Sequence, residues 1–253
     1  MRRDFVANVS HEIRTPLTVL SGFIETLQNL PLGEGERRTY LGLMNQQAQR
    51  LNSLVGDLLT LSRLEGSPAP GVKEWIPVRE LIAQCESEGM ALTRIAGGPQ
   101  IELRLGSGVS DEVAGAHQEL LSAMSNLVSN AIRYTPPQDG QVRITWSRRP
   151  DGSGEFSVED NGPGIAPEHL PRLTERFYRV DRSRSRDTGG TGLGLAIVKH
   201  VVQRHGGSLA ISSQPGLGSR FAISFPPLRV RRGPATVAQA ALQLEAADSP
   251  EPG

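Results

Sequence analysis

The feature that most constrains this chain is an apolar residue at every seventh position near its N-terminus. The residues with this spacing are Val6, Ile13, Leu20 and Leu27. An α-helix has 3.6 residues per turn, so positions seven apart lie on one face. Residues 4–30 are therefore predicted to form one amphipathic helix, which Pro31-Leu32-Gly33 ends.

A second apolar stripe runs through residues 36–65. Its members alternate between spacings of three and four: Leu41, Met44, Ala48, Leu51, Val55 and Leu58. Two such helices joined by a short loop form a hairpin, and both stripes are too long for one hairpin to cover. We therefore predict a homodimer through residues 1–65, in which two hairpins form a four-helix bundle.

The sequence pattern after residue 65 predicts a linker, a second domain and a tail. Residues 66–73 begin with the helix-breaking run GSPAPG and are predicted to be a linker. Residues 74–228 mix strand and helix patterns, which predicts an α+β sandwich with helices on one face of a sheet. The expected helices are 78–92, 117–134 and 193–205, and the expected strands are 100–105, 141–147, 155–159, 208–212 and 220–224. Residues 229–253 lack periodicity and are predicted to be a disordered tail.

Composition excludes several functions. The 27 basic and 27 acidic residues cancel, which gives no sign of nucleic-acid or membrane-surface binding. The single cysteine, Cys85, cannot form an internal disulfide, so a reducing cytoplasm fits. No apolar run approaches the roughly 20 residues that span a bilayer.

His11 is the first candidate for chemistry. At 100° per residue it lies about 140° from the stripe of Val6 and Ile13, so it is predicted to face solvent. An exposed imidazole has an unprotonated, nucleophilic ring nitrogen near neutral pH. Glu12 can accept the proton of the other nitrogen. For an isolated histidine, however, an ordinary surface residue is the simpler interpretation.

The surrounding string favours the chemical interpretation. Residues 10–17, SHEIRTPL, resemble the H-box of sensor histidine kinases, whose dimerisation hairpin carries the phosphorylated histidine. The resemblance implies catalytic roles for His11, Glu12 and Thr15. Thr15 lies one turn after His11 and can hold a water there, which indicates phosphatase activity toward the regulator as well.

The second domain should then hold ATP. Asn126 and Asn130 are one turn apart on one helix face, and amide oxygens suit Mg²⁺ that is partly bound by phosphates. The segment resembles the N-box of the same family. The resemblance implies that Arg133 and Tyr134, which follow Asn130, contact the phosphates and the ring of the nucleotide. An isolated asparagine pair on a helix would be interpreted as polar surface. Apolar residues flank this pair, however, which indicates that the asparagines border the core.

Two glycine-rich segments complete the predicted pocket. Asp160 can accept a hydrogen bond from the adenine amino group, and DNGPGI at 160–165 resembles the G1 box. GTGLGL at 190–195 precedes a helix, where backbone N–H groups bind phosphate, and it resembles the G2 box. The arginine-rich loop between them resembles the F-box and ATP lid.

The resemblance covers nearly all of residues 4–226 and is nearest to the phosphate-regulon sensor kinases. It implies a GHKL/Bergerat-type ATPase domain, autophosphorylation of His11, and transfer to a response-regulator aspartate. It also implies the cytoplasmic part of an inner-membrane receptor, with ATP and Mg²⁺ as cofactors. The implied ATP-binding residues are Asn126, Asn130, Arg133, Tyr134, Asp160, Gly162, Gly164, Ile165, Phe177, Arg184, Arg186, Thr191, Gly192, Leu193, Gly194 and Leu195, with Asn130 and Asn126 also holding the metal.

Three alternative functions fit parts of the sequence. A chaperone or DNA-repair ATPase with the same nucleotide fold would lack the histidine-bearing hairpin. A non-catalytic dimeric scaffold would not need every expected catalytic position occupied. A nucleic-acid binder using the arginine loop conflicts with the zero net charge and with the lack of a recognition motif.

Overall fold

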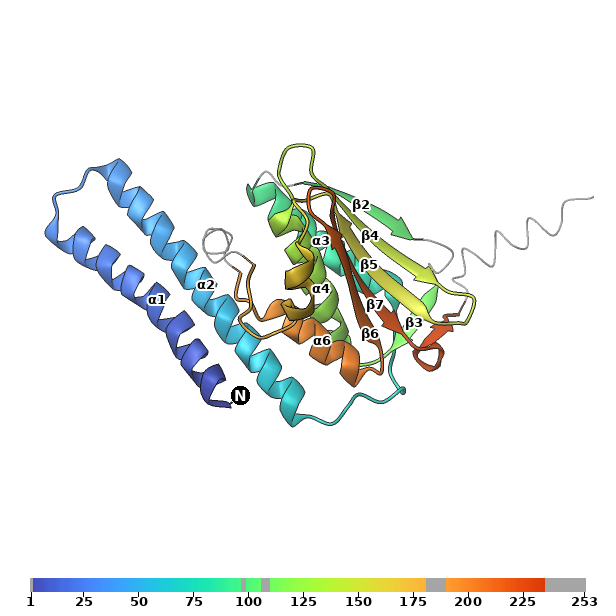
Figure 1. Cartoon of the computed structure of the whole chain (residues 1–253). Coiled ribbons are helices and arrows are strands. Elements are labelled where there is room, and N and C mark those ends of the chain that lie inside the picture. The colour runs from blue at the N-terminus through green and yellow to red at the C-terminus, as the bar shows by residue number, and fades with distance from the viewer. Residues whose placement is uncertain (1, 97–98, 106–109, 181–189, 235–253) are drawn as a thin grey trace, which may run out of the picture. The chain divides into compact units, whose positions relative to one another are not determined.

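The computed structural model describes residues 2–96, 99–105, 110–180 and 190–234 (Figure 1). The chain divides into two compact units, residues 1–67 with 171–200 and residues 68–170 with 201–253. The elements are α1 (Arg2–Asn29), α2 (Glu34–Gly66), β1 (Trp75–Pro77), α3 (Val78–Ala96), β2 (Gln100–Leu105), β3 (Asp111–Ala114), α4 (His117–Tyr134), β4 (Gln141–Arg148), β5 (Gly154–Asp160), η1 (Pro167–Arg172), α6 (Gly194–Arg204), β6 (Ser208–Gln214), β7 (Gly218–Phe225), η2 (Pro227–Arg229) and β8 (Val230–Arg232).

Helices α1 and α2 form the predicted hairpin. The two helices contact each other, and the rings of Phe23 and Tyr40 lie 5.5 Å apart near the connecting loop. The loop ends where the backbone N–H of Gly33 donates to the Glu36 carboxylate at 3.0 Å. Pro16 lies inside α1 and is buried. It has no N–H to donate to the carbonyl one turn earlier.

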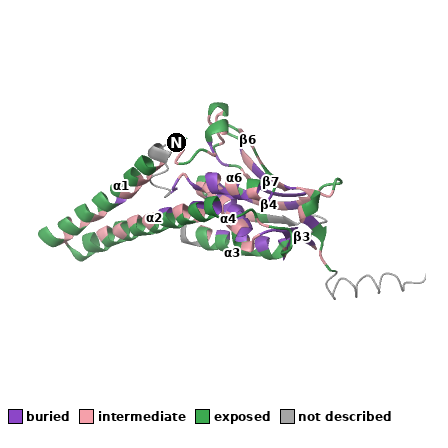
Figure 2. Cartoon of the chain, turned by 90° about the horizontal axis from the view of Figure 1, so that it is seen from below, coloured by how far each residue is buried: buried purple, intermediate pink, exposed green. Residues whose placement is uncertain are grey.

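The hairpin leaves much of its apolar surface exposed. The exposed large apolar side chains of α1 and α2 include Val6, Leu17, Val19, Ile24, Leu41, Leu43, Val55 and Leu59. Figure 2 shows exposed and half-buried residues along most of both helices. Apolar residues that remain exposed to solvent along a helical hairpin are typical of a hairpin that packs against a second hairpin.

The second unit is built on a five-stranded sheet of order β2-β4-β5-β7-β6. Strands β2 and β4 are parallel, and the other neighbours are antiparallel. Gly216 and Gly218 in the tight turn between β6 and β7 have positive φ, as expected for the predicted hairpin turn. The five strands correspond to the five that the sequence predicts.

Helices α3 and α4 pack against each other and cover one face of this sheet (Figure 1). Side chains Val142, Ile144 and Trp146 alternate toward this face along β4 and are buried. Helix α4 buries a broad apolar stripe against them. Cys85 of α3 is buried here, and burial raises the pKa of its thiol to about 11, so it is an unreactive packing residue.

The opposite sheet face carries charged side chains in mutual contact. Arg143 pairs with Glu102 at 3.0 Å and with Glu159 at 3.4 Å, and Arg220 pairs with Glu159 at 2.9 Å. Glu155 pairs with Arg220 at 2.5 Å. Such pairs keep this face compatible with water. Helices on one side and charge on the other confirm the predicted α+β sandwich.

A three-stranded antiparallel sheet, β1-β3-β8, was not predicted. Its strands are three or four residues long, which is too short for an alternating pattern to stand out. Strand β8 pairs with β3 from Val113 to Asp111, so the predicted tail begins later than Arg229. The part from 235 to 253 lies outside the described residues.

None of the helices in the described part of the chain is both long enough and apolar enough to cross a bilayer.

Candidate active site

His11 lies in the middle of α1 and is exposed, as predicted. The hydroxyl of Thr15, one turn on, donates to the His11 carbonyl at 3.1 Å. This bond orients the Thr15 side chain along the helix toward the turn that carries the imidazole. His11 and Thr15 are therefore neighbours on one exposed stretch of α1.

Glu12 is held by arginine. Its Oε2 atom accepts from Nη2 of Arg50 on α2 at 3.2 Å, and the Arg50 side chain is 13% exposed. The same oxygen lies 3.2 Å from Nη2 of Arg179, which belongs to the same unit. The two guanidinium groups thus hold the carboxylate next to the candidate nucleophile in one orientation. Sequence reasoning missed Arg50, although the antiparallel register of the hairpin places it opposite Glu12.

The asparagines of α4 lie at the border of the core. Asn126 and Asn130 are half-buried, while Leu127, Val128 and Ala131 between and beside them are buried. The side-chain nitrogen of Asn126 donates to the Ser122 carbonyl at 2.8 Å. The amide oxygens of such a pair remain the groups suited to a ligand.

The turn after β5 packs against the end of α4. A Cβ at Gly162 would lie 2.8 Å from the Tyr134 carbonyl oxygen and 2.9 Å from Oδ1 of Asp160. The structure therefore brings the predicted adenine-binding turn to the end of the asparagine helix. Arg133 is half-buried and Tyr134 is 47% exposed at this end.

Asp160 ends β5 in a half-buried position. Its Oδ1 accepts from the Gly162 N–H at 2.9 Å. Burial raises the pKa of the Asp160 carboxyl, and hydrogen bonds from the backbone of Gly162 and Ser219 partly offset this. The carboxyl is thus fixed by the backbone on both sides, which suits a group that must recognise one fixed donor.

Gly164 and Ile165 lie beside the end of β6. Gly164 has φ +70°, and a Cβ there would lie 2.0 Å from the Gln214 carbonyl oxygen. The Ile165 N–H donates to Oγ of Ser213 at 2.8 Å. The serine links the turn to β7, since it also donates to the Gly218 carbonyl at 2.8 Å. No sequence motif points to Ser213.

The second glycine segment belongs to the compact unit that contains the hairpin, since residues 171–200 cluster with residues 1–67. The Phe177 N–H donates to the Gly192 carbonyl at 2.8 Å, and both residues have positive φ. The Thr191 hydroxyl oxygen accepts from the Leu193 N–H at 3.2 Å, just before α6 begins at Gly194. Leu193 is buried, whereas Gly194 and Leu195 are half-buried. Arg184 and Arg186 lie outside the described residues.

Similarity to known proteins agrees with this arrangement. Residues 1–67 match the family described as His Kinase A (phospho-acceptor) domain, and residues 115–229 match the family described as histidine kinase-, DNA gyrase B-, and HSP90-like ATPase. The phosphate regulon sensor protein PhoR of Pseudomonas aeruginosa is 48% identical over 231 residues, which cover 91% of this chain and 51% of PhoR.

Two solved structures share the architecture. Full-length ShkA in complex with AMPPNP has a TM-score of 0.63 and 28% identity, covering 97% of this chain and 54% of ShkA. The histidine kinase ThkA in complex with the response regulator protein TrrA has a TM-score of 0.66 and 23% identity, covering 88% of this chain and 61% of that one.

The chain belongs to the sensor histidine kinase family, in the branch of the phosphate-regulon sensors. It spans about half the length of the curated relatives it matches.

Proposed function

We propose that this chain is the catalytic core of a two-component sensor kinase, which phosphorylates His11 with ATP and passes the phosphoryl group to a response-regulator aspartate. The observation that supports this most is the exposed imidazole of His11 directly before Glu12, whose carboxylate Arg50 holds at 3.2 Å. The ATPase match at residues 115–229 supplies the donor in the same chain.

The proposed chemistry is an in-line displacement. A ring nitrogen of His11 forms a bond to the γ-phosphorus as the bond to the ADP oxygen breaks. Glu12 is placed to take the proton of the other ring nitrogen, and Arg50 keeps its carboxylate oriented. The aspartate of the regulator then attacks the phosphohistidine, which restores the imidazole. The chain contributes mainly positioning and charge stabilisation.

Asn126 and Asn130 fit a divalent cation that is held mainly by phosphate oxygens. The Asn126 amide nitrogen is already bonded to the Ser122 carbonyl, so its oxygen is the end left to face a ligand. Within the described ranges no three His, Cys, Asp or Glu side chains form a metal cluster, which agrees with amide and phosphate ligands. Mg²⁺ bound there would neutralise phosphate charge.

The partners of this core follow from the same features. The exposed heptad residues of α1 and α2 support a homodimer through the hairpin. The ThkA–TrrA complex supports a response regulator as the phosphoryl acceptor. We place the reaction on the cytoplasmic side of the membrane, as part of a receptor. Thr15, exposed beside His11, supports a second activity that hydrolyses the phosphorylated regulator.

Labelling with γ-labelled ATP and Mg²⁺ tests the proposal. The wild-type chain should acquire acid-labile, base-stable label, and His11→Ala should acquire none. His169→Ala removes a histidine of η1 as the matched control and should label normally. Label that survives in His11→Ala would exclude His11 as the acceptor.

A glycine pair tests the pocket. Gly164 and Gly216 have nearly the same φ, +70° and +80°, but a Cβ meets the Gln214 carbonyl only at Gly164 and open space at Gly216. Both Ala variants bear a backbone strain of about 1–2 kcal/mol, whereas Gly164→Ala must also displace the turn that follows Asp160. We expect at least about a tenfold loss of ATP affinity by calorimetry in Gly164→Ala alone. Equal affinities in the two variants would place ATP elsewhere.

A further inference from the structure

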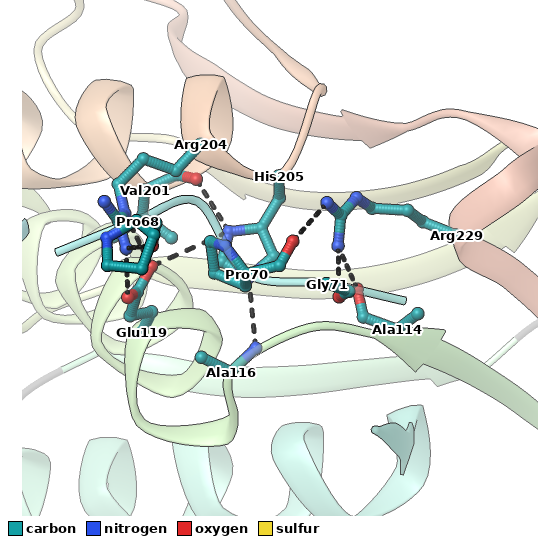
Figure 3. A network of polar contacts seen from close by, with 10 residues as sticks. All are labelled: Pro68, Pro70, Gly71, Ala114, Ala116, Glu119, Val201, Arg204, His205 and Arg229. Atoms are coloured by element: carbon teal, nitrogen blue, oxygen red, sulfur yellow. Dashed lines mark hydrogen bonds and ion pairs between the residues drawn. The ribbon is translucent and has the colours of Figure 1, made fainter. Parts of the chain in front are cut away.

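The segment that enters the second unit is held by two arginines. Nη2 of Arg229 donates to the Pro70 carbonyl at 2.8 Å, and its Nη1 donates to the Gly71 carbonyl at 3.1 Å. Nη2 of Arg204 donates to the Pro68 carbonyl at 2.8 Å. Figure 3 shows both guanidinium groups turned toward this backbone. These three carbonyls with Arg204 and Arg229 are called the linker clamp.

The sequence of the segment explains why arginines are needed. Pro68 and Pro70 have no N–H, so the segment offers acceptors but few donors and cannot pair as a strand. A guanidinium group has five N–H donors in a rigid plane and can hold several carbonyls at once. Nη1 of Arg229 also donates to the Ala114 carbonyl at the end of β3, at 3.0 Å.

The clamp is anchored in the core of the second unit. Glu119 of α4 accepts from Nε and Nη2 of Arg204 at 3.1 and 2.9 Å, which fixes the guanidinium plane. The next residue, His205, is fully buried; its Nε2 accepts from the Ala116 N–H at 3.2 Å, and its Nδ1 donates to the Val201 carbonyl at 2.8 Å. The end of α6 is thereby attached to the start of α4.

The clamp shortens the connection between α2 and β1. Helix α2 ends at Gly66, the Ser67 N–H donates to the Arg63 carbonyl at 3.0 Å, and Arg204 binds the Pro68 carbonyl, so the helix passes directly into the pinned segment. Without both arginines, the next fixed carbonyl is that of Glu74, which accepts from the Gly115 N–H at 3.0 Å. Residues 68–73 would then form the connection, which spans about 20 Å when extended.

We propose that Arg204 and Arg229 are positioning residues for autophosphorylation, because they pin residues 68–71 directly after α2 and so shorten the tether of the ATP-binding domain. The inference rests on the proposed phosphorylation of His11. A group that reaches its target through a flexible tether has an effective concentration that falls roughly as the −3/2 power of tether length. The run GSPAPG, called the strap, is therefore a fixed segment and not a flexible linker.

The test is a graded series of variants in the full chain, measured by autophosphorylation rate at saturating ATP. Arg229→Ala leaves Pro68 pinned and should stay within about twofold of wild type. Arg204→Ala moves the first fixed carbonyl to Pro70 and should slow the reaction about fivefold. The double variant should slow it about twentyfold, since all of residues 68–73 then lengthen the tether. The KM for ATP and the phosphotransfer rate from phosphorylated His11 should not change.

Two controls separate tether length from folding. Arg231→Ala removes the neighbouring β8 arginine, which pairs with Glu112 at 2.7 Å and not with the strap, and should match wild type. A six-residue Gly/Ser insertion after Ser67 keeps the clamp but lengthens the tether by as many residues as the double variant releases, so it should match the double variant.

Wild-type rates in the insertion variant, or a raised KM for ATP in the double variant, would overturn the positioning role. If wild-type protein itself shows no label on His11, the proposed function fails instead.

Discussion

The hairpin and the ATP-binding domain differ in how much of their apolar surface they cover by themselves. Helix α2 has 33 residues, of which Leu54, Leu61 and Leu64 are buried. Helix α4 has 18 residues and buries eight: Leu120, Leu121, Ala123, Met124, Leu127, Val128, Ala131 and Ile132. The ATP-binding domain thus closes its own core, whereas the hairpin leaves apolar side chains exposed. The difference teaches that the stability of the ATP-binding domain is intrinsic, whereas the proposed homodimer would add stability to the hairpin by association.

Truncating one leucine in each region should give the largest contrast. Leu127 is fully buried in α4 and Leu59 is 54% exposed on α2. Leu127→Ala should cost the ATP-binding domain about 2–5 kcal/mol, because it leaves a cavity. Leu59→Ala should change the stability of the monomer by less than about 1 kcal/mol. Urea unfolding followed by fluorescence of the buried Trp146 measures the first and circular dichroism the second; similar costs would abolish the contrast.

Charging the exposed hairpin stripe should break association without unfolding. In Val55→Glu with Leu59→Glu, each new carboxylate would have to be buried between two hairpins. We expect the dimer dissociation constant to rise at least about 100-fold, or about 2.7 kcal/mol, by sedimentation equilibrium. Gln46→Glu with Gln49→Glu, at two exposed positions of α2 away from this stripe, is the charge-matched control. A double variant that still dimerises would mean that another surface associates.

Acid should weaken the ATP-binding domain through His205. Burial lowers the pKa of His205 below the ordinary value of 6.5; its hydrogen bond to Val201 and nearby Glu119 oppose the shift, while Arg229 and Arg204 add to it. Because the folded-state pKa is depressed, its contribution to stability is present above pH 6.5 and is lost as pH falls through the folded pKa.

One proton gives at most about 1.4 kcal/mol per pH unit. Chemical unfolding at pH 7.5, 6.5 and 5.5 should show this decline in wild type and a flatter profile in His205→Gln. A decline of the same slope in both proteins would assign it to other groups.

Replacing Arg50 of the hairpin should have the smallest effect on the free energy of unfolding. Arg50→Gln removes the partner of Glu12 at a partly exposed pair, so the free energy of unfolding should change by no more than about 1 kcal/mol. The autophosphorylation rate should nevertheless fall several-fold, because the Glu12 carboxylate loses its orientation. Arg38→Gln, at an exposed position of α2, is the control for charge. A wild-type rate in Arg50→Gln would show that Arg50 is not needed to orient the Glu12 carboxylate.

Much of the architecture was predictable from local patterns. The seven-residue spacing placed the first two helices at 4–30 and 36–65, and they occupy Arg2–Asn29 and Glu34–Gly66. All five strands of the large sheet were predicted, because alternation and turn glycines mark them. The predicted exposure of His11 is confirmed as well. These features depend only on residues a few positions apart.

The missed features all join distant parts of the chain. The β1-β3-β8 sheet unites residues near 75, 112 and 231, and each strand is too short to be seen alone. Arg50 reaches Glu12 across 38 positions. No pattern in a short window records such pairings.

The sequence by itself determined the periodic helices, the position of His11 and the segments that resemble a nucleotide pocket, because side-chain spacing decides which face of a helix or strand is apolar. Only the tertiary structure decided which charges meet. Arg229 stands in what composition describes as a tail, yet it holds Pro70 and Gly71 about 159 positions earlier. A Pro/Gly-rich run looks flexible when it is considered alone, and it becomes fixed only when donors from elsewhere in the fold reach its carbonyls.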